Sequence, residues 1–214
     1  MTQLIRPFAS SDRSALRQIA FETAFMGDSA RIFFEGQEFL KDALTLYFTD
    51  YEPESAWVAQ GDEGIIGYIM GARDEQRMDK VILTRIIPRL VVDALRDGLL
   101  LRGRNIKLLG GFARSLFKGE FSMPSFSKTY PAVLHINIKK DSRGQGTGDA
   151  LMKTLLDDFT KSGVQGVRLA TMSSGASGFF CKSGFSILFK GRRSYLDSLA
   201  GQEVPLYILG RELR

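Results

Sequence analysis

Three glycines, each separated from the next by one residue, form the clearest chemical feature of this sequence. Gly144, Gly146 and Gly148 lie in the string RGQGTG, which begins at Arg143 and is followed by an amphipathic helical pattern. Glycine has no Cβ atom, so the backbone can adopt positive φ and approach a ligand closely. The first N–H groups of a helix lack partners within it and, with the helix dipole, attract anions. The segment therefore predicts a phosphate-binding loop.

Nucleotide-binding motifs with similar glycine spacing differ in register. A Walker A motif needs a lysine directly after its last glycine, and none is present here. The dinucleotide-binding motif, begun at Gly144, would need glycine at the position of Asp149. The pattern [Q/R]-x-x-G-x-[G/A] fits at Arg143, Gly146 and Gly148. An ordinary glycine-rich turn between a strand and a helix is the competing interpretation.

A histidine and an amide lie on the strand predicted just before the loop. His135 is the only histidine of the chain, and strand alternation places it on one face with Asn137. Imidazole can act as a base near neutral pH, directly or through water. The competing hypothesis is a half-buried histidine hydrogen-bonded to a neighbouring strand. The single cysteine, Cys181, is interpreted as a small buried hydrophobic residue and not as a nucleophile.

The surrounding pattern predicts a mixed α/β fold that positions these residues. Apolar and β-branched runs predict the strands, and apolar residues at helical spacing predict the helices. The glycine loop lies in a βαβ crossover. Strands are expected at 4–8, 55–60, 65–71, 134–139, 167–172, 185–190 and 204–209, and helices after residue 12 and at 39–48, 149–161 and 177–183.

Residues 73–130 differ from the rest, with few strand signals and many cations. We interpret them as a helical insertion in a single domain spanning 1–214, with breaks at Pro88, Gly98 and Gly103. The insertion could be a lid whose arginines meet an anionic acceptor or cofactor phosphates. It could instead dimerise the chain as a homodimer, or touch membrane or nucleic acid. A solvated helical face is the favoured hypothesis for most of its arginines.

Composition sets wider limits. The 214 residues carry a formal net charge of +5, which favours anionic partners such as a polyphosphate cofactor. With one cysteine, no intramolecular disulfide can form. No apolar run resembles a signal peptide or approaches the roughly 20 residues of a membrane span, so a cytoplasmic protein is expected and membrane is disfavoured as a partner. Few aromatic residues interleave with the cations, which argues against nucleic acid.

The motif at Arg143 and its context resemble the GNAT superfamily of N-acetyltransferases. In that family the motif follows a strand and opens a helix, and a Phe-Tyr pair and a Gly-Phe follow about thirty residues later. Matching residues here are Phe179, Gly184 and Phe185, together with Ala176. The N-terminal Ile-Arg-Pro and the hairpin ending Ile-Gly-Tyr are also similar to the family. The resemblance covers roughly residues 1–72 and 131–190 and excludes the insertion.

The resemblance implies a GNAT fold, with a mostly antiparallel central sheet splayed at the cofactor site and flanked by helices. It implies direct transfer of the acetyl group of acetyl-CoA to a primary amine, which we expect to belong to a small molecule, without a metal. The expected catalytic residues are His135 and Asn137. The expected cofactor-binding residues are Ile136, Ile138, Arg143, Gly144, Gln145, Gly146, Thr147, Gly148, Ser173 and Phe180.

Two positions depart from the family pattern. Phe180 replaces the tyrosine that often protonates the departing thiolate. The string YPAVLHI at 130–136 also resembles bacterial GNAT proteins related to the hexosaminidase-linked acetyltransferase-like domain, in which aspartate tends to occupy the Asn137 position. Protein lysine or N-terminal acetylation, and a non-catalytic module that senses acyl-CoA, are therefore kept as alternatives.

Overall fold

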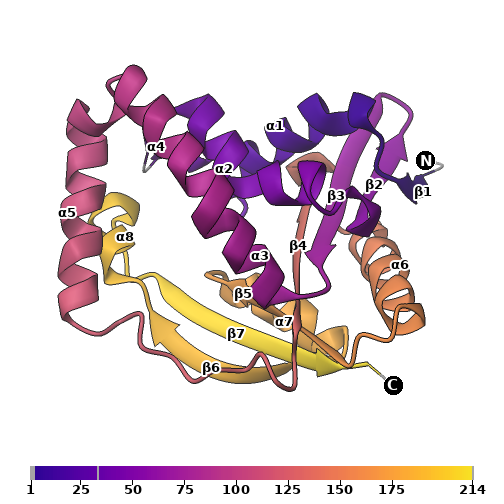
Figure 1. The fold of residues 1–214 in the computed structure, drawn as a ribbon. Coiled ribbons are helices and arrows are strands. Elements are labelled where there is room, and N and C mark those ends of the chain that lie inside the picture. Colours follow the sequence, from indigo (N-terminus) through magenta and orange to yellow (C-terminus); the bar gives the residue numbers. More distant parts are fainter. Residues whose placement is uncertain (1–2, 33, 214) are drawn as a thin grey trace.

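A seven-stranded sheet forms the centre of the computed structural model, which describes residues 3–32 and 34–213 (Figure 1). The strands are β1 Leu4–Pro7, β2 Ala56–Gly61, β3 Gly64–Ala72, β4 Ala132–Ile138, β5 Gly166–Thr171, β6 Ser186–Arg192 and β7 Pro205–Glu212. Their order is β1-β2-β3-β4-β5-β7-β6. Every pair is antiparallel except β4 and β5, which run parallel. The predicted mixed, mostly antiparallel sheet is confirmed.

Helices cover both faces of the sheet. They are α1 Arg13–Thr23, α2 Gln37–Asp50, α3 Glu75–Val81, α4 Ile87–Arg96, α5 Gly103–Phe117, α6 Thr147–Lys161, α7 Ser174–Lys182 and α8 Ser194–Ala200. Residues of α6 and α7 pack with Ile69 and Leu134, whereas residues of α1 pack with Tyr68 and Met70. Because side chains alternate along β3, these two cores lie on opposite faces.

The helix after the glycine loop is held by one apolar stripe. Leu151, Leu155 and Phe159 recur every fourth residue of α6, and all three are fully buried. This spacing places them on one helix face, against the sheet. The stripe fixes the direction in which the first turn of α6 points. α8, in contrast, is a seven-residue helix that the sequence pattern did not predict.

The region between β3 and β4 is helical, and one predicted break within it is wrong. α3 and α4 are continuous through a π-helical turn, Ile82–Ile86, so the chain does not break at Pro88. The Ile87 N–H donates to the Ile82 carbonyl, one residue farther than in an α-helix. A π turn shifts the hydrogen-bond ladder, and a proline without an N–H fits where the ladder slips. The predicted breaks at Gly98 and Gly103 are present.

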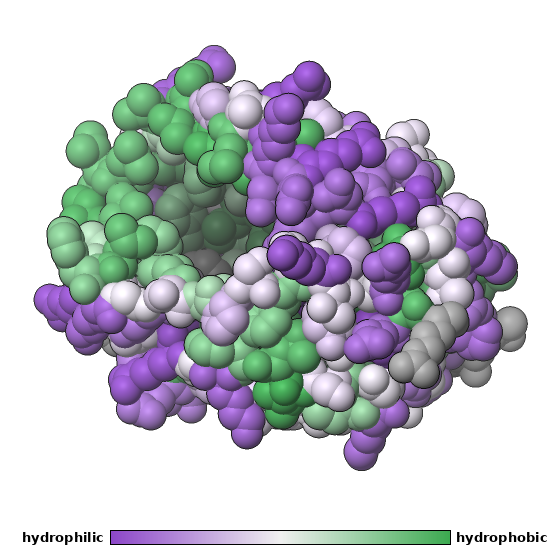
Figure 2. Space-filling view, turned by 60° about the horizontal axis from the view of Figure 1, so that its bottom comes forward, coloured by the Kyte–Doolittle hydropathy of each residue, from purple (hydrophilic) through white to green (hydrophobic). Residues whose placement is uncertain are grey.

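α4 and α5 also expose large apolar side chains. Ile87, Val91 and Leu95 of α4 are 41%, 47% and 62% exposed, and α5 exposes Leu109 and Leu116. Figure 2 shows hydrophobic residues gathered beside a hollow in the surface. The cations that dominate the sequence of this region therefore share their helices with exposed apolar stripes. Within the described residues, no helix is both long and apolar enough to cross a membrane.

Candidate active site

The sheet opens between β4 and β5. The two strands pair only at Ala132–Val167 and Val133–Arg168, and they diverge from Leu134 onward. The Lys139 N–H donates to the Ile66 carbonyl, 2.8 Å away, on the β3 side. Because main-chain groups alternate along an antiparallel ladder, those of residues 134, 136 and 138 face the opening. The main chain at Ile136 and Ile138, the two predicted positions, therefore borders the gap.

A cavity of about 890 Å³ occupies this opening. Its walls come from β4, β5, the glycine loop, the start of α7 and the segment after α1. Most of the predicted site residues line it: His135, Ile136, Asn137, Ile138, Arg143, Gly144, Gly146, Gly148, Ser173 and Phe180.

Two predicted residues do not line the cavity. The Thr147 side chain is buried, and its hydroxyl donates to Oε1 of Gln3 at 2.5 Å. Gln145 is exposed, and its Nε2 donates to the Asp141 carbonyl at 3.4 Å. Their side chains thus act in holding the loop, and only their main chain is positioned to serve a ligand.

The glycine loop has the geometry of an anion site. Gly144 and Gly146 have φ of 76° and 78°, in the left-handed region that favours glycine. A Cβ atom at either residue would meet only open space, so the surface above the loop is free. The first helical hydrogen bond runs from the Ala150 N–H to the Gly146 carbonyl. The N–H groups of residues 147–149 thus have no helical acceptor.

Gly148 has a different role from the one predicted. Its φ is not positive, so the expectation of a positive φ is wrong at this glycine. A Cβ atom here would lie 3.1 Å from Cζ of Phe179 and 3.4 Å from Cδ1 of Ile138. The missing side chain therefore lets α7 and β4 approach the first turn of α6.

Arg143 fastens the loop to its surroundings. Its Nε donates to the Ile138 carbonyl at 3.1 Å, and its Nη2 donates to the Gly27 carbonyl at 3.2 Å. The guanidinium thereby joins the end of β4 to the segment after α1. These bonds give Arg143 a positioning role at the edge of the cavity.

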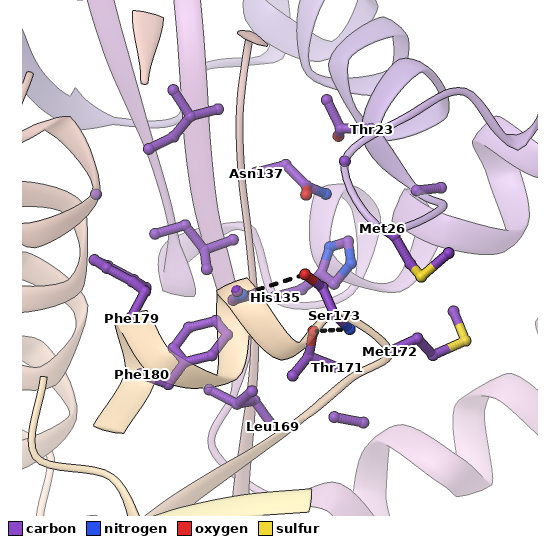
Figure 3. Close-up of a pocket in the computed structure, with 18 of the residues that line it drawn as sticks. Thr23, Met26, His135, Asn137, Leu169, Thr171, Met172, Ser173, Phe179 and Phe180 are labelled. Atoms are coloured by element: carbon purple, nitrogen blue, oxygen red, sulfur yellow. Dashed lines mark hydrogen bonds between the residues drawn. The ribbon is translucent and has the colours of Figure 1, made fainter. Parts of the chain in front are cut away.

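His135 and Asn137 meet at a residue of the neighbouring strand. Nδ2 of Asn137 donates to the hydroxyl of Tyr68 at 2.8 Å, and that hydroxyl lies 3.2 Å from Nδ1 of His135. The Tyr68 oxygen accepts from Asn137, and with His135 in the Nε2–H tautomer the Tyr68 hydroxyl donates its proton to Nδ1. This assignment places the remaining imidazole proton on Nε2. Figure 3 shows His135 and Asn137 on the side of β4 that faces Thr23 and Met26.

The electrostatics of this group oppose protonation of the histidine. Burial lowers the pKa of His135 to about 4, so the ring is neutral at pH 7. Burial raises the pKa of Tyr68 well above its ordinary value, so the hydroxyl keeps its proton. A base works best with a pKa near the working pH. The arrangement suits a hydrogen-bond donor at Nε2 better than the predicted general base.

The segment after β5 closes the other wall. Oγ of Ser173 accepts from the Ala176 N–H at 3.2 Å and so caps α7, and the Ser173 N–H donates to Oγ1 of Thr171 (Figure 3). The Phe180 ring is buried, with ring centroids 5.3 Å from Phe179 and 6.0 Å from Phe185. These aromatic rings form an apolar wall.

Cys181 does not match its predicted burial. The residue is exposed on α7, and it is absent from the cavity lining. A neighbour of a buried residue on a helix points about 100° away from it, and Phe180 takes the inward position. The interpretation of Cys181 as a buried hydrophobic residue is therefore wrong.

Few charges line the cavity, and no metal cluster is present in the part of the chain that the structure describes. The charged side chains of the lining are Arg143, Asp149 and Arg193. Residues 3–32 and 34–213 contain no group of three or more His, Cys, Asp or Glu side chains suited to a metal ion.

Comparisons with known proteins identify the fold of the chain. No family model and no curated protein sequence matches the chain. Among solved structures, SsHAT is 24% identical over the whole of both chains, with a TM-score of 0.74. A GNAT superfamily phosphinothricin acetyltransferase from Sinorhizobium meliloti, solved in complex with AcCoA, is 14% identical. The match covers all of this chain and 89% of that one, with a TM-score of 0.59. This chain has the GNAT fold.

The GNAT fold is shared by proteins with different acceptors. A polyamine N-acetyltransferase from Drosophila melanogaster, which forms N-acetylagmatine, is 14% identical over 99% of this chain and all of its own. Its TM-score is 0.59. The Phe-Tyr pair of the family pattern reads Phe179-Phe180 in this sequence, and the Phe180 ring has no hydroxyl. Tyr195 and Tyr207 are absent from the cavity lining and do not replace it.

Sequence reasoning missed two residues of the site. Tyr68 connects His135 to Asn137, and Arg193 lines the cavity from the end of β6. The hairpin ending at Tyr68 was itself predicted, and its strand period could have placed Tyr68 beside β4. No local signal marked Arg193, because its position depends on the turn between β6 and α8.

Proposed function

We propose that this protein is an N-acetyltransferase that transfers the acetyl group of acetyl-CoA directly to a primary amine of a small molecule. The observation that carries the proposal is the single cavity that joins the first turn of α6 to the open edge of β4. Anionic phosphates suit the free N–H groups beyond Gly146. The extended pantetheine arm suits the main chain at Ile136 and Ile138, which has no strand partner.

Acetyl-CoA supplies the thioester whose carbonyl the amine attacks. The chain contributes hydrogen-bond donors that need not reorganise. A main-chain N–H of β4, aimed into the splay, can stabilise negative charge that develops on the carbonyl oxygen. A preorganised donor of this kind is commonly worth about 3 kcal/mol of transition-state stabilisation. The Nε2–H of His135 is a second donor, on the face of β4 that also carries Asn137.

The amine must reach the thioester without its extra proton. His135 is a poor base with its pKa near 4 and with Nδ1 already accepting a hydrogen bond. Among the described residues the only carboxylate in the lining is Asp149, in the first turn of α6. The acceptor therefore loses its proton to solvent, and kcat/KM rises with pH toward the pKa of the free amine. A thiolate is only modestly basic, so it leaves without the proton that a tyrosine at 180 would donate.

Calorimetry with acetyl-CoA tests the loop. Gly146→Asp introduces a negative charge and a side chain where the phosphates are expected, and we expect a loss of affinity of at least about 100-fold. Gly163→Asp is the matched control, because Gly163 also has a positive φ of 75° and an open Cβ position but lies beyond the far end of α6. Unchanged affinity in a folded Gly146→Asp protein would contradict the proposal.

Thiol release from acetyl-CoA with a panel of amines tests turnover. The panel contains small primary amines, and it includes peptides with a free N-terminus or lysine to cover acetylation of proteins. The alternative of another class is a GNAT-like module that binds acyl-CoA without turnover, and Phe180 is the observation that favours it. Tight binding with no thiol release across the panel would support that module and reject the enzyme.

A further inference from the structure

One arginine of the cavity wall lies outside the glycine loop. Arg193 follows β6 directly, is half-buried, and lines the cavity, as do Leu206 and Met172. Its Nη1 donates to the Glu120 carbonyl at 2.7 Å, and its guanidinium lies 4.8 Å from the ring centroid of Phe121. These contacts hold the group in place without neutralising its charge.

The carboxylate of Glu120, the residue whose carbonyl accepts from Arg193, is hydrogen-bonded to Ser194. Glu120 accepts the Ser194 N–H at 2.9 Å and the Ser194 hydroxyl at 2.5 Å. No ion pair involves Arg193 within the described residues. A partly desolvated cation of this kind gains most from an anion that enters the cavity.

Arg193 and the glycine loop precede different helices. α8, which follows Arg193, and α6, which follows the loop, lie on opposite sides of β4 in Figure 1. The other two charged groups of the lining belong to the loop side, because Arg143 holds the loop and Asp149 lies in the first turn of α6. Among the described residues that line the cavity, Arg193 is therefore the one charged group that belongs neither to the glycine loop nor to α6.

We propose that Arg193 binds an anionic oxyacid group of the acceptor, so that the acceptor is a primary amine that also carries a carboxylate or a phosphate. This inference rests on the proposed function. A guanidinium matches both oxyacid groups because its planar fork can donate two parallel hydrogen bonds. A polycationic amine instead meets a like charge at Arg193. The same cation disfavours protonation of a nearby amine, which suits a site without a strong base.

Paired acceptors test the inference directly. Phenylalanine and phenylalaninamide differ in one anionic group, as do phosphoethanolamine and ethanolamine, and the two pairs distinguish a carboxylate from a phosphate. For at least one pair we expect kcat/KM of the wild-type protein to be at least about 10-fold higher for the anionic member. Arg193→Met should reduce that ratio to below about 3-fold, mainly through KM, and Arg193→Lys should restore part of it.

Two controls separate this inference from the proposed function. Lys190→Met removes an exposed cation of β6 that lies outside the cavity lining, and it should leave the ratio unchanged. Acetyl-CoA affinity should be the same in the Arg193→Met protein as in the wild type. Turnover of amines with no preference for the anionic members, or a preference that survives Arg193→Met, would overturn the role of Arg193 while the acetyltransferase stands. Loss of acetyl-CoA affinity in Arg193→Met would assign the arginine to the donor and also overturn it.

Discussion

The hydroxyl of Tyr68 lies 3.2 Å from Nδ1 of His135, and it accepts a hydrogen bond from Asn137 at 2.8 Å. The three side chains form a chain of hydrogen bonds across β3 and β4. Its direction is set at the Asn137 end, since an amide nitrogen can only donate. In the tautomer whose Nδ1 accepts from Tyr68, the histidine presents Nε2–H.

NMR titration of the imidazole checks this arrangement. His135 is the only histidine of the chain, so its signals need no assignment by mutation. We expect a midpoint near pH 4, in place of the ordinary value near 6.5, and a nitrogen shift pattern with the proton on Nε2. A midpoint above about 6 would contradict the lowered pKa and would restore His135 as a base.

The same shift predicts how stability depends on pH. The folded pKa of His135 is below the unfolded value, so the unfolded chain binds more protons between about pH 6.5 and 4. The contribution of His135 to stability is therefore complete above pH 6.5 and is lost as the pH falls toward 4. Urea denaturation of His135→Gln should show a weaker pH dependence than the wild type in this window. Parallel curves for the two proteins would argue against the shift.

Tyr68→Phe should separate hydrogen bonding from packing. Tyr68 is fully buried, and the ring volume is retained in the variant, so the core remains filled. The lost hydrogen bonds should cost about 1 kcal/mol of unfolding free energy. Turnover should fall about 10-fold, because His135 and Asn137 lose the group that orients them, while the Kd for acetyl-CoA is retained. Full turnover in a folded variant would remove this trio from catalysis.

Gly148→Ala should lower the stability of the protein, because the new methyl group crowds Phe179. The new Cβ atom would lie 3.1 Å from Cζ of Phe179, closer than ordinary van der Waals contact. We expect about 1–2 kcal/mol of lost stability and weaker acetyl-CoA binding, because the first turn of α6 must move. Combining it with Phe179→Leu should recover most of the stability, in a double-mutant cycle with a coupling energy above about 0.5 kcal/mol. Additive effects would show that crowding is not the cause.

An ion pair closes the narrow end of the splay. Arg168 of β5 pairs with Glu75, the first residue of α3, and both side chains are mostly buried. Glu75→Gln should reduce the unfolding free energy by about 2 kcal/mol, because it leaves a partly buried guanidinium without its counter-charge. Glu63→Gln, in the exposed turn of the β2–β3 hairpin, should change stability by less than about 0.5 kcal/mol in the same urea titration. Equal effects of the two substitutions would show that the pair contributes nothing specific.

Local patterns predicted the parts of the fold that depend on local chemistry. Strand alternation placed His135 with Asn137, and glycine spacing placed the loop before α6. The pattern could not show that Tyr68 lies between those two side chains, since that contact joins residues 67 positions apart. It also could not predict that Phe179 would occupy the space above Gly148, because that contact depends on how α7 packs.

Two sequence predictions were wrong because tertiary packing overrides a local preference at those positions. Proline usually ends a helix, yet Pro88 is accommodated where a π turn shifts the ladder. Cysteine is usually buried, yet Cys181 is exposed beside an inward-pointing phenylalanine. The sequence pattern did not mark Arg193, because its place in the cavity wall depends on tertiary packing. Which charges remain unpaired depends on tertiary contacts, and a local sequence pattern does not contain them.

The two-pair contact between β4 and β5 has a mechanical consequence. The sheet consists of two hydrogen-bonded panels, one formed by β1 to β4 and the other by β5, β7 and β6. The strand pairing between the panels is limited to the two residue pairs of β4 and β5. A force that pulls the two panels apart would act on the main-chain hydrogen bonds at Ala132–Val167 and Val133–Arg168. A pantetheine arm lying between the panels would carry part of that load, so acetyl-CoA would stiffen the protein as well as supply its acetyl group.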